Sequence, residues 1–177
     1  MPEQEVLFED DSRGTFIEGP YRYSLWRTWK GHGDRALCGW VMLNPSTANN
    51  RDDDPTIRRC MAYAKAWRYA GIVVRNLFAL RATRPRDLLT ASDTASDPVG
   101  PDNDNWLRQW EGMDRIVVAW GTGRYPRLKG RWEGVAALLE PLHPVCLSTA
   151  RDGQLVHPLY QPAGLVPRPW RVPIRRW

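Results

Sequence analysis

Hydrophobic and polar positions divide the chain into short apolar runs separated by longer mixed segments. Four apolar runs cover residues 36–43, 72–78, 115–120 and 144–148. Runs of this length, ended by Pro, Gly or polar residues, are typical of strands buried on both faces. Ahead of them, residues 14–30 place aromatic and β-branched residues around Gly19-Pro20, which predicts a β-hairpin.

The segments between the apolar runs have helical character. Residues 55–70 carry apolar side chains at helical spacing, with Asp54 suited to cap, Pro55 at the first position and Gly71 at the end. Helices are also expected over 102–112 and 127–140, and an irregular connection over 81–101. Alternating strands and helices predict an α/β three-layer sandwich: a small, mainly parallel four-stranded sheet between helices, plus the N-terminal hairpin.

Length and composition favour one domain. The chain has 177 residues, 42% of them hydrophobic, enough for one sizeable core. We expect an acidic, flexible N-terminus over 1–13, a single domain over 14–166 and a basic tail rich in Arg and Trp over 167–177. No apolar stretch is long enough to cross a bilayer, so a cytoplasmic monomer that does not enter membranes is expected. The three cysteines have no metal-ligand or pairing spacing, so reduced thiols, no metal and no cofactor are expected.

The charge is unevenly distributed. Residues 1–11 hold five acidic side chains and no basic ones, so removing them from the total of +5 leaves +10 on the rest. The last eleven residues place four arginines beside Trp170 and Trp177. Arginine beside tryptophan suits phosphate contact and base stacking, which predicts a nucleic-acid partner, DNA rather than RNA. A tail that packs its tryptophans on the domain and leaves its arginines in solvent explains the same residues.

Short polar groups lie at the end of each predicted strand or just after it. They are Asn44-Pro45-Ser46-Thr47, Asn76, Gly121-Thr122-Gly123, and Ser148-Thr149 with His157 further on. Ligands of parallel sheets bind outside the carboxyl ends of the strands. An asparagine amide matches the polar edge of a pyrimidine, and a histidine donor stabilises negative charge on an oxygen.

These positions give a set of candidate site residues. Asn44 and His157 are the catalytic candidates. The substrate-binding candidates are Pro45, Ser46, Thr47, Asn76, Phe78, Trp120, Thr149 and Tyr160. The nucleic-acid-binding candidates are Arg75, Arg81, Arg84, Arg168, Arg171, Arg175 and Arg176, and Asp53 and Asp54 are further polar candidates.

Each candidate also has a structural explanation. Asn-Pro-Ser-Thr is a common turn whose side chains bond their own backbone. Asn76 would equally serve as a buried structural amide, and His157 as a satisfied loop histidine. Capping of the following helix accounts for Asp54.

Five separated strings resemble one known family. MLNPSTANNRDDDPTIRRC, VVRNLFALRATRPRDL, GPDND, VVAWGT and HPLY occur in an order similar to the family called domain of unknown function 1643, over roughly residues 20–161. A Thr-Lys-x-Gly stretch expected before HPLY is replaced by residues 149–153, Thr-Ala-Arg-Asp-Gly. That resemblance implies no activity.

A more distant resemblance implies one. The Asn-Pro-Ser loop, the strand ending in Asn76 and the His157-Pro158 pair are similar to motifs of the uracil-DNA glycosylase superfamily. The resemblance implies a uracil-DNA-glycosylase-like fold, with Asn44 positioning water, Asn76 reading a base edge and His157 stabilising the departing base. It implies an N-glycosylase on a flipped pyrimidine. A non-catalytic nucleic-acid-binding module, and an enzyme on a nucleotide or phosphorylated metabolite, are the alternatives.

Overall fold

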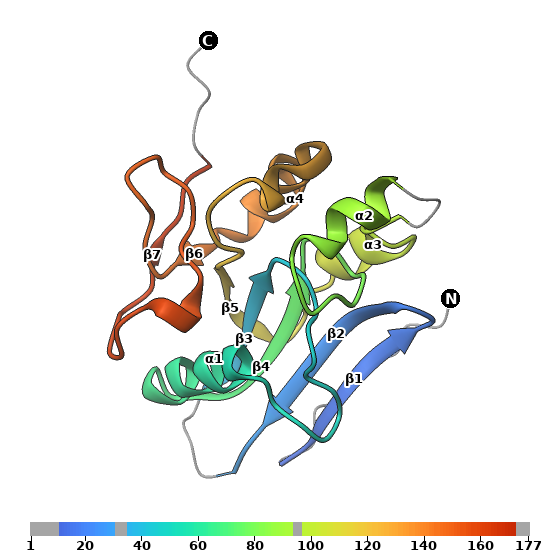
Figure 1. The fold of residues 1–177 in the computed structure, drawn as a ribbon. Helices are drawn as coiled ribbons and strands as arrows, with labels where there is room; N and C mark the ends of the chain where they lie inside the picture. The colour runs from blue at the N-terminus through green and yellow to red at the C-terminus, as the bar shows by residue number, and fades with distance from the viewer. Residues whose placement is uncertain (1–10, 31–34, 94–96, 173–177) are drawn as a thin grey trace.

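The computed structural model describes residues 11–30, 35–93 and 97–172. Within these ranges seven strands form one sheet in the order β1-β2-β4-β3-β5-β6-β7 (Figure 1). The strands are β1 (Arg13–Glu18), β2 (Tyr21–Thr28), β3 (Arg35–Met42), β4 (Tyr69–Asn76), β5 (Met113–Val118), β6 (Val145–Cys146) and β7 (Arg168–Pro169). The α-helices of the described residues are α1 (Pro55–Ala66), α2 (Asp87–Asp93), α3 (Asn103–Arg108) and α4 (Arg131–Leu139). Short 3-10 helices are η1 (Tyr125–Gly130), η2 (Glu140–Leu142) and η3 (Pro158–Tyr160).

The mixed α/β class is confirmed, but the sheet is larger than predicted. The ladders β4–β3, β3–β5 and β5–β6 are parallel, whereas β1–β2, β2–β4 and β6–β7 are antiparallel. The prediction of four strands is therefore wrong. The hairpin joins the sheet because β2 pairs with β4, and residues 168–169 add β7 because they pair with β6. Each addition gives hydrogen-bond partners to backbone groups at an edge of the central strands.

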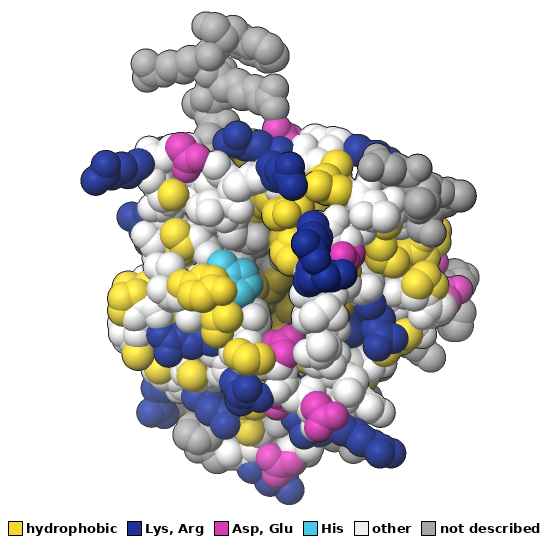
Figure 2. Space-filling model, viewed as in Figure 1, with side chains coloured by type: hydrophobic (Ala, Val, Ile, Leu, Met, Phe, Trp, Pro, Cys, Tyr) yellow, Lys and Arg dark blue, Asp and Glu magenta, His cyan; other side chains and the backbone are white. Residues whose placement is uncertain are grey.

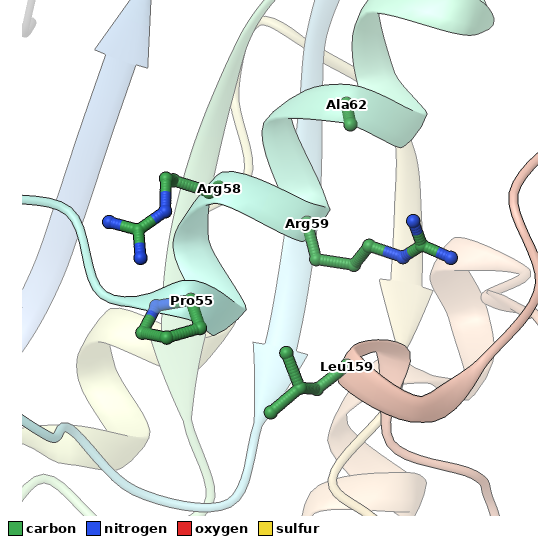
Figure 3. A pocket seen from close by; sticks show the side chains of 5 residues that line it. All are labelled: Pro55, Arg58, Arg59, Ala62 and Leu159. Atoms are coloured by element: carbon green, nitrogen blue, oxygen red, sulfur yellow. The ribbon is translucent and has the colours of Figure 1, made fainter.

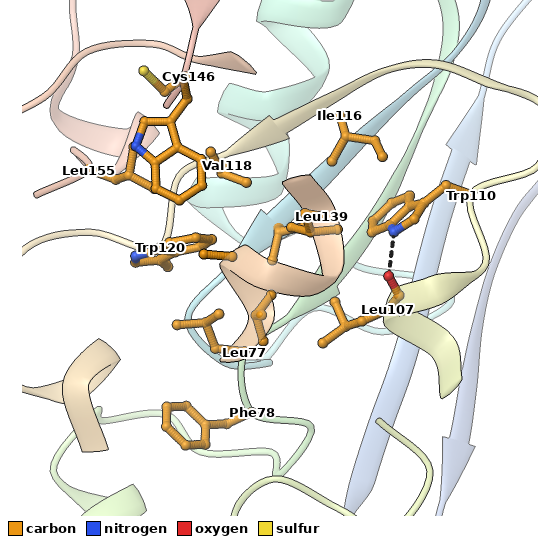
Figure 4. Close-up of a cluster of buried hydrophobic side chains, with 14 of the residues drawn as sticks. Leu77, Phe78, Leu107, Trp110, Ile116, Val118, Trp120, Leu139, Cys146 and Leu155 are labelled. Carbon is orange, nitrogen blue, oxygen red and sulfur yellow. Dashed lines mark hydrogen bonds between the residues drawn. The ribbon is translucent and has the colours of Figure 1, made fainter. Parts of the chain in front are cut away.

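Helices cover both faces of the sheet. α1 packs on one face, where Ile57 and Cys60 meet Trp40 of β3. The other face lies under α2, α3 and α4. Its core includes Leu88 of α2 together with Leu107 and Leu139 (Figure 4). Among the helices of the described segments, none has the length and apolar character needed to cross a membrane.

Several predicted element boundaries are wrong. The connection over 81–101 contains α2, which the sequence signalled only through the Leu88-Leu89 pair. The helix expected over 127–140 starts as η1 and becomes α4 only at Arg131, where positive φ angles at Lys129 and Gly130 break the first turn. The basic tail is not separate: β7 pairs with β6, and Trp170 is 7% exposed.

Candidate functional site

The carboxyl ends of β4, β3 and β5 lie level with one another. Met42 of β3 is in register with Asn76 of β4, and Val41 with Val118 of β5. The chain leaves β3 toward α1 on one face and leaves β5 toward α4 on the other. Loops that diverge in this way open a crevice at the carboxyl edge of the sheet, which is where ligands of such sheets bind.

His157 reaches this edge from far along the chain. Gly121 lies three residues after β5 and has a φ of +90°, and a Cβ placed on it would lie 3.6 Å from the Cβ of His157. The fold therefore brings the ends of β3 and β4 and His157 to the same edge of the sheet. Asn44, Asn76 and His157 are among the predicted site residues at this edge.

Asn44 has a fixed amide with one unused atom. Its Nδ2 donates to the backbone oxygens of Pro45 (2.9 Å) and Ala82 (2.7 Å). Both amide hydrogens are thereby used, so the orientation of the group is set. No hydrogen bond to Oδ1 occurs within the described residues. The half-buried side chain thus offers one oriented acceptor, the group needed to align a water molecule.

Asn76 is a buried amide whose nitrogen has no partner. Its side chain is 2% exposed, and by strand alternation it shares a sheet face with Ile72 and Val74, the face covered by α1. Nδ2 is buried and makes no hydrogen bond to any residue that the structure describes. An unsatisfied buried donor of this kind costs about 1–3 kcal/mol, so an unpaired amide here calls for a functional reason.

His157 is held as a neutral donor. Its Nδ1 accepts a hydrogen bond from the backbone N–H of Leu159 at 3.3 Å, which leaves the ring proton on Nε2. Burial lowers the pKa of His157 below its ordinary value, and the carboxylate of Asp54 opposes that shift. The ring of Tyr160 lies 6.0 Å away, on a side chain that is 81% exposed. An uncharged imidazole with a free Nε2–H suits the stabilisation of an anion.

The two aspartates predicted as polar site candidates, Asp53 and Asp54, have different partners. Asp54 caps α1, its Oδ1 accepting from the N–H of Ile57 at 2.8 Å, and its charge also acts on His157 and Arg22. Asp53 accepts from Arg13 (2.8 Å) and Arg27 (2.7 Å). Asp53 is therefore part of a structural ion-pair network rather than of the crevice. In the part of the chain that the structure describes, no three His, Cys, Asp or Glu side chains are grouped as metal ligands.

Arginines of the hairpin hold the loop that carries Asn44. Arg13, Arg22 and Arg27 donate to the backbone oxygens of Arg51, Ala48 and Asn49 respectively. Arg22 and Arg27 are each 2% exposed. The sequence analysis did not single out these three residues, because arginine is typically a surface residue, and their guanidinium groups donate to the backbone of the loop.

Two shallow pockets flank this edge. One, of about 370 Å³, is lined by Pro20, Ser46, Thr47, Arg81, Ala82 and Thr83. The other, of about 420 Å³, is lined by Pro55, Arg58, Arg59, Ala62 and Leu159 (Figure 3). Neither is lined by Asn44, Asn76 or His157, but the first contains Ser46, two residues after Asn44, and the second contains Leu159, two residues after His157. Figure 2 shows a hollow bordered by a histidine, with Lys and Arg side chains around it.

Three predicted ligand contacts lie in the core instead. Phe78 is 0% and Trp120 is 4% exposed, and both belong to the cluster under α4 (Figure 4). Arg75 is 6% exposed, with its guanidinium 4.5 Å from the ring centre of Trp110 and 5.5 Å from that of Trp106. Burial lowers the pKa of Arg75 to about 10. The structure leaves these side chains no surface for a base or a phosphate.

The remaining candidates lie nearer the surface. Trp170 packs edge-on against Trp120 at 5.5 Å, so it cannot stack on bases, and the hydroxyl of Thr149 accepts from Arg168 at 2.9 Å. Arg81, Arg84, Arg168 and Arg171 are exposed. Pro45 is buried, while Ser46 is half-buried and Thr47 is exposed. Arg175 and Arg176 lie outside the described residues.

Comparison with known proteins gives one result. Residues 22–159 match the model of a family described as Protein of unknown function (DUF1643). No curated protein and no solved structure matches the chain, so the resemblance to the uracil-DNA glycosylases gains no support from either comparison.

Proposed function

The chain belongs to the DUF1643 family, and we propose that it is a base-processing enzyme acting on nucleic acid, most concretely an N-glycosylase on a uracil-like or modified pyrimidine. The observation that carries the proposal is the chemistry at the carboxyl edge of β3, β4 and β5. There the chain keeps an oriented acceptor on Asn44, an unpaired amide on Asn76 and a neutral donor on His157. The uracil-DNA-glycosylase-like fold remains part of this proposal.

Each group has a role in hydrolysis of an N-glycosidic bond. Oδ1 of Asn44 accepts from a water molecule and aligns its oxygen with the anomeric carbon. As the new C–O bond forms, the C–N bond breaks and its electron pair stays with the base. Nε2–H of His157 stabilises the negative charge on the base oxygen, and the water's proton finally resides on the released base.

Asn76 supplies recognition in this scheme. Its amide nitrogen lacks a partner in the protein, and a pyrimidine carbonyl oxygen is a suitable acceptor for it. Because the side chain is 2% exposed, a base reaches it only after the covering side chains move. Tyr160, 81% exposed beside His157, offers a ring on which a base can stack.

Release of free base tests the proposal. Single-stranded and duplex oligonucleotides carrying uracil or a modified pyrimidine are incubated with the purified chain, and the released base is quantified by mass spectrometry. We expect release by the parent protein, with a loss of about 10²- to 10³-fold for His157→Ala, the usual effect of removing one charge-stabilising donor. Asn44→Ala is expected to reduce release while leaving substrate binding measurable.

Matched controls separate chemistry from folding. His143 is exposed and adopts a positive φ of 49°, so His143→Asn replaces a histidine away from the site without backbone strain. Asn50 is an exposed asparagine of the same loop as Asn44, so Asn50→Ala is the corresponding control. Both controls should release base at the parent rate. Absence of release from every substrate by the folded parent protein rules out the glycosylase.

A further inference from the structure

The pocket beside the Asn44 loop has walls that are fixed before any ligand binds. We call it the Ser46–Arg81 pocket; it is lined by Pro20, Ser46, Thr47, Arg81, Ala82 and Thr83. Three chain segments meet there: the β1–β2 turn, the loop after β3 and the loop after β4. The N–H of Arg81 donates to Pro20 (3.1 Å), and the N–H of Ala82 donates to Pro45 (2.9 Å). These backbone bonds hold the three segments in place, so binding requires little ordering.

Polar side chains of the Ser46–Arg81 pocket are available to bind a ligand. The hydroxyls of Ser46, Thr47 and Thr83 make no hydrogen bond within the described residues. The guanidinium of Arg81 likewise has no carboxylate within salt-bridge distance there. Hydroxyl donors around an unpaired guanidinium form the donor set that binds a phosphate group.

A buried cation adds to the positive field. Arg22 is 2% exposed and donates to the backbone oxygen of Ala48, two residues from Ser46, while its Nε is buried without a partner. Burial lowers the pKa of Arg22 to about 10, which leaves it charged at neutral pH. The charges of Arg81 and Arg27 also lower this pKa, and the carboxylate of Asp54 opposes them. Arg22 does not line the pocket, but an anion bound at Arg81 offsets part of this positive charge.

The other pocket lacks this character. In it, Arg58 donates to the backbone oxygen of Asp53 and Arg59 to that of Gln161. Figure 3 shows the two side chains leaving α1 in opposite directions. Their guanidinium groups are engaged and do not converge, so this pocket is the weaker candidate for an anion.

We propose that the Ser46–Arg81 pocket binds a phosphate group of a nucleotide or nucleic-acid strand, with Arg81 as the charged contact and the three hydroxyls as donors. The assignment to a nucleotide or strand rests on the proposed function. Ser46 follows Asn44 by two residues, so their Cα atoms lie within about 7 Å. A phosphate held there leaves the attached sugar and base at the crevice.

Binding measured without catalysis tests the inference. Inorganic phosphate, thymidine monophosphate and a six-nucleotide oligothymidylate are titrated into the parent protein and Arg81→Gln at several salt concentrations. We expect Arg81→Gln to weaken oligonucleotide binding about tenfold or more and to lower the slope of log affinity against log salt by about 1. Arg108→Gln removes the same charge from the exposed end of α3 and should change neither.

Each outcome is informative about the pocket. A loss of oligonucleotide binding confined to Arg81→Gln supports a strand phosphate. If Arg81→Gln weakens the binding of free phosphate and the mononucleotide but not of the oligonucleotide, the pocket is supported. The assignment to a nucleic-acid strand is then overturned. Equal affinities for parent and Arg81→Gln, with unchanged unfolding midpoints, overturn the inference. Because no base is released in these titrations, failure of the glycosylase leaves the result intact. Ser46→Ala, which keeps the charge, should lower affinity without changing the salt slope.

Discussion

Replacement of Arg27 by Met is expected to destabilise the protein strongly. The Arg27 side chain is 2% exposed, and its Nε donates to Asp53 at 2.7 Å. Its other nitrogens donate to the backbone oxygens of Trp26 (2.8 Å) and Asn49. Met keeps the aliphatic stem but removes the buried donor from Oδ1 of Asp53 and from these carbonyls, while Arg13 still pairs with Oδ2. Breaking a buried ion pair from one side costs about 3–5 kcal/mol, and because Asp53 keeps Arg13 we expect a loss at the lower end of that range.

The same carboxylate provides its own control. Arg13 also pairs with Asp53, at 2.8 Å, but its side chain is 42% exposed. An exposed pair of this kind contributes about 0–1 kcal/mol after solvent screening, so Arg13→Met should lie in that range and approach zero in high salt. The Arg27 pair should be little affected by salt.

Denaturant unfolding followed by tryptophan fluorescence measures both variants. The chain contains 10 Trp residues, so the signal change on unfolding is large. The free energy of unfolding is extrapolated to water for the parent protein, for each single variant and for the double variant that combines Arg27→Met and Asp53→Asn. If Arg27→Met costs no more than Arg13→Met, the reasoning that buried arginines anchor the Asn44 loop is refuted.

Three further changes probe other parts of the account. Trp170→Ala should lower the free energy of unfolding in urea by about 3–5 kcal/mol, because Trp170 packs on Trp120. Tyr160 is exposed, so Tyr160→Ala should change that free energy by less than about 0.5 kcal/mol. Similar values for the two variants would contradict a packed tail. Gly121→Ala should cost about 1–2 kcal/mol, since its φ of +90° strains any other residue while the new Cβ meets His157 only at 3.6 Å; an unchanged unfolding midpoint would contradict this. Burial lowers the pKa of His157 from its ordinary 6.5, so on acidification the unfolded state binds the proton before the folded state does. The free energy of unfolding should therefore fall as the pH drops below about 6.5, and this group should contribute no pH dependence above that value. His157→Gln should make the pH dependence of the unfolding free energy shallower in that window, and an identical dependence would show that His157 is not buried as a neutral group.

Periodicity predicted that the central elements exist, for a physical reason, but not where the helices end: α1 stops at Ala66 instead of 70, and α3 at Arg108 instead of 112. The runs ending at Asn44 and Asn76 and the helix capped by Asp54 carry local signals, since buried strands and helix caps depend on neighbouring residues in the chain. β7 was missed because only its pairing with β6, more than 20 residues earlier, makes Arg168-Pro169 a strand.

The positions of Asn44 and Asn76 at strand ends were predictable, but the surroundings of the candidate side chains were not. The carboxyl-edge rule applied to Asn44 and Asn76 because their strands are parallel neighbours. Which arginines are buried and which are exposed was not predictable, since Arg75 and Arg81 differ only in what packs around them. The same applies to Phe78 and Trp120, whose apolar side chains are as well suited to a core as to a base.

The central claim is that Asn44, Asn76 and His157 meet one ligand at the carboxyl edge of the sheet. An NMR titration with a non-hydrolysable analogue of a uracil-containing oligonucleotide tests it, observing the side-chain amides of both asparagines and the ring nitrogens of His157. The account predicts that all three signals shift with one dissociation constant. Binding that leaves these signals in place while shifting others, such as those of exposed Arg168 and Arg171, would contradict it.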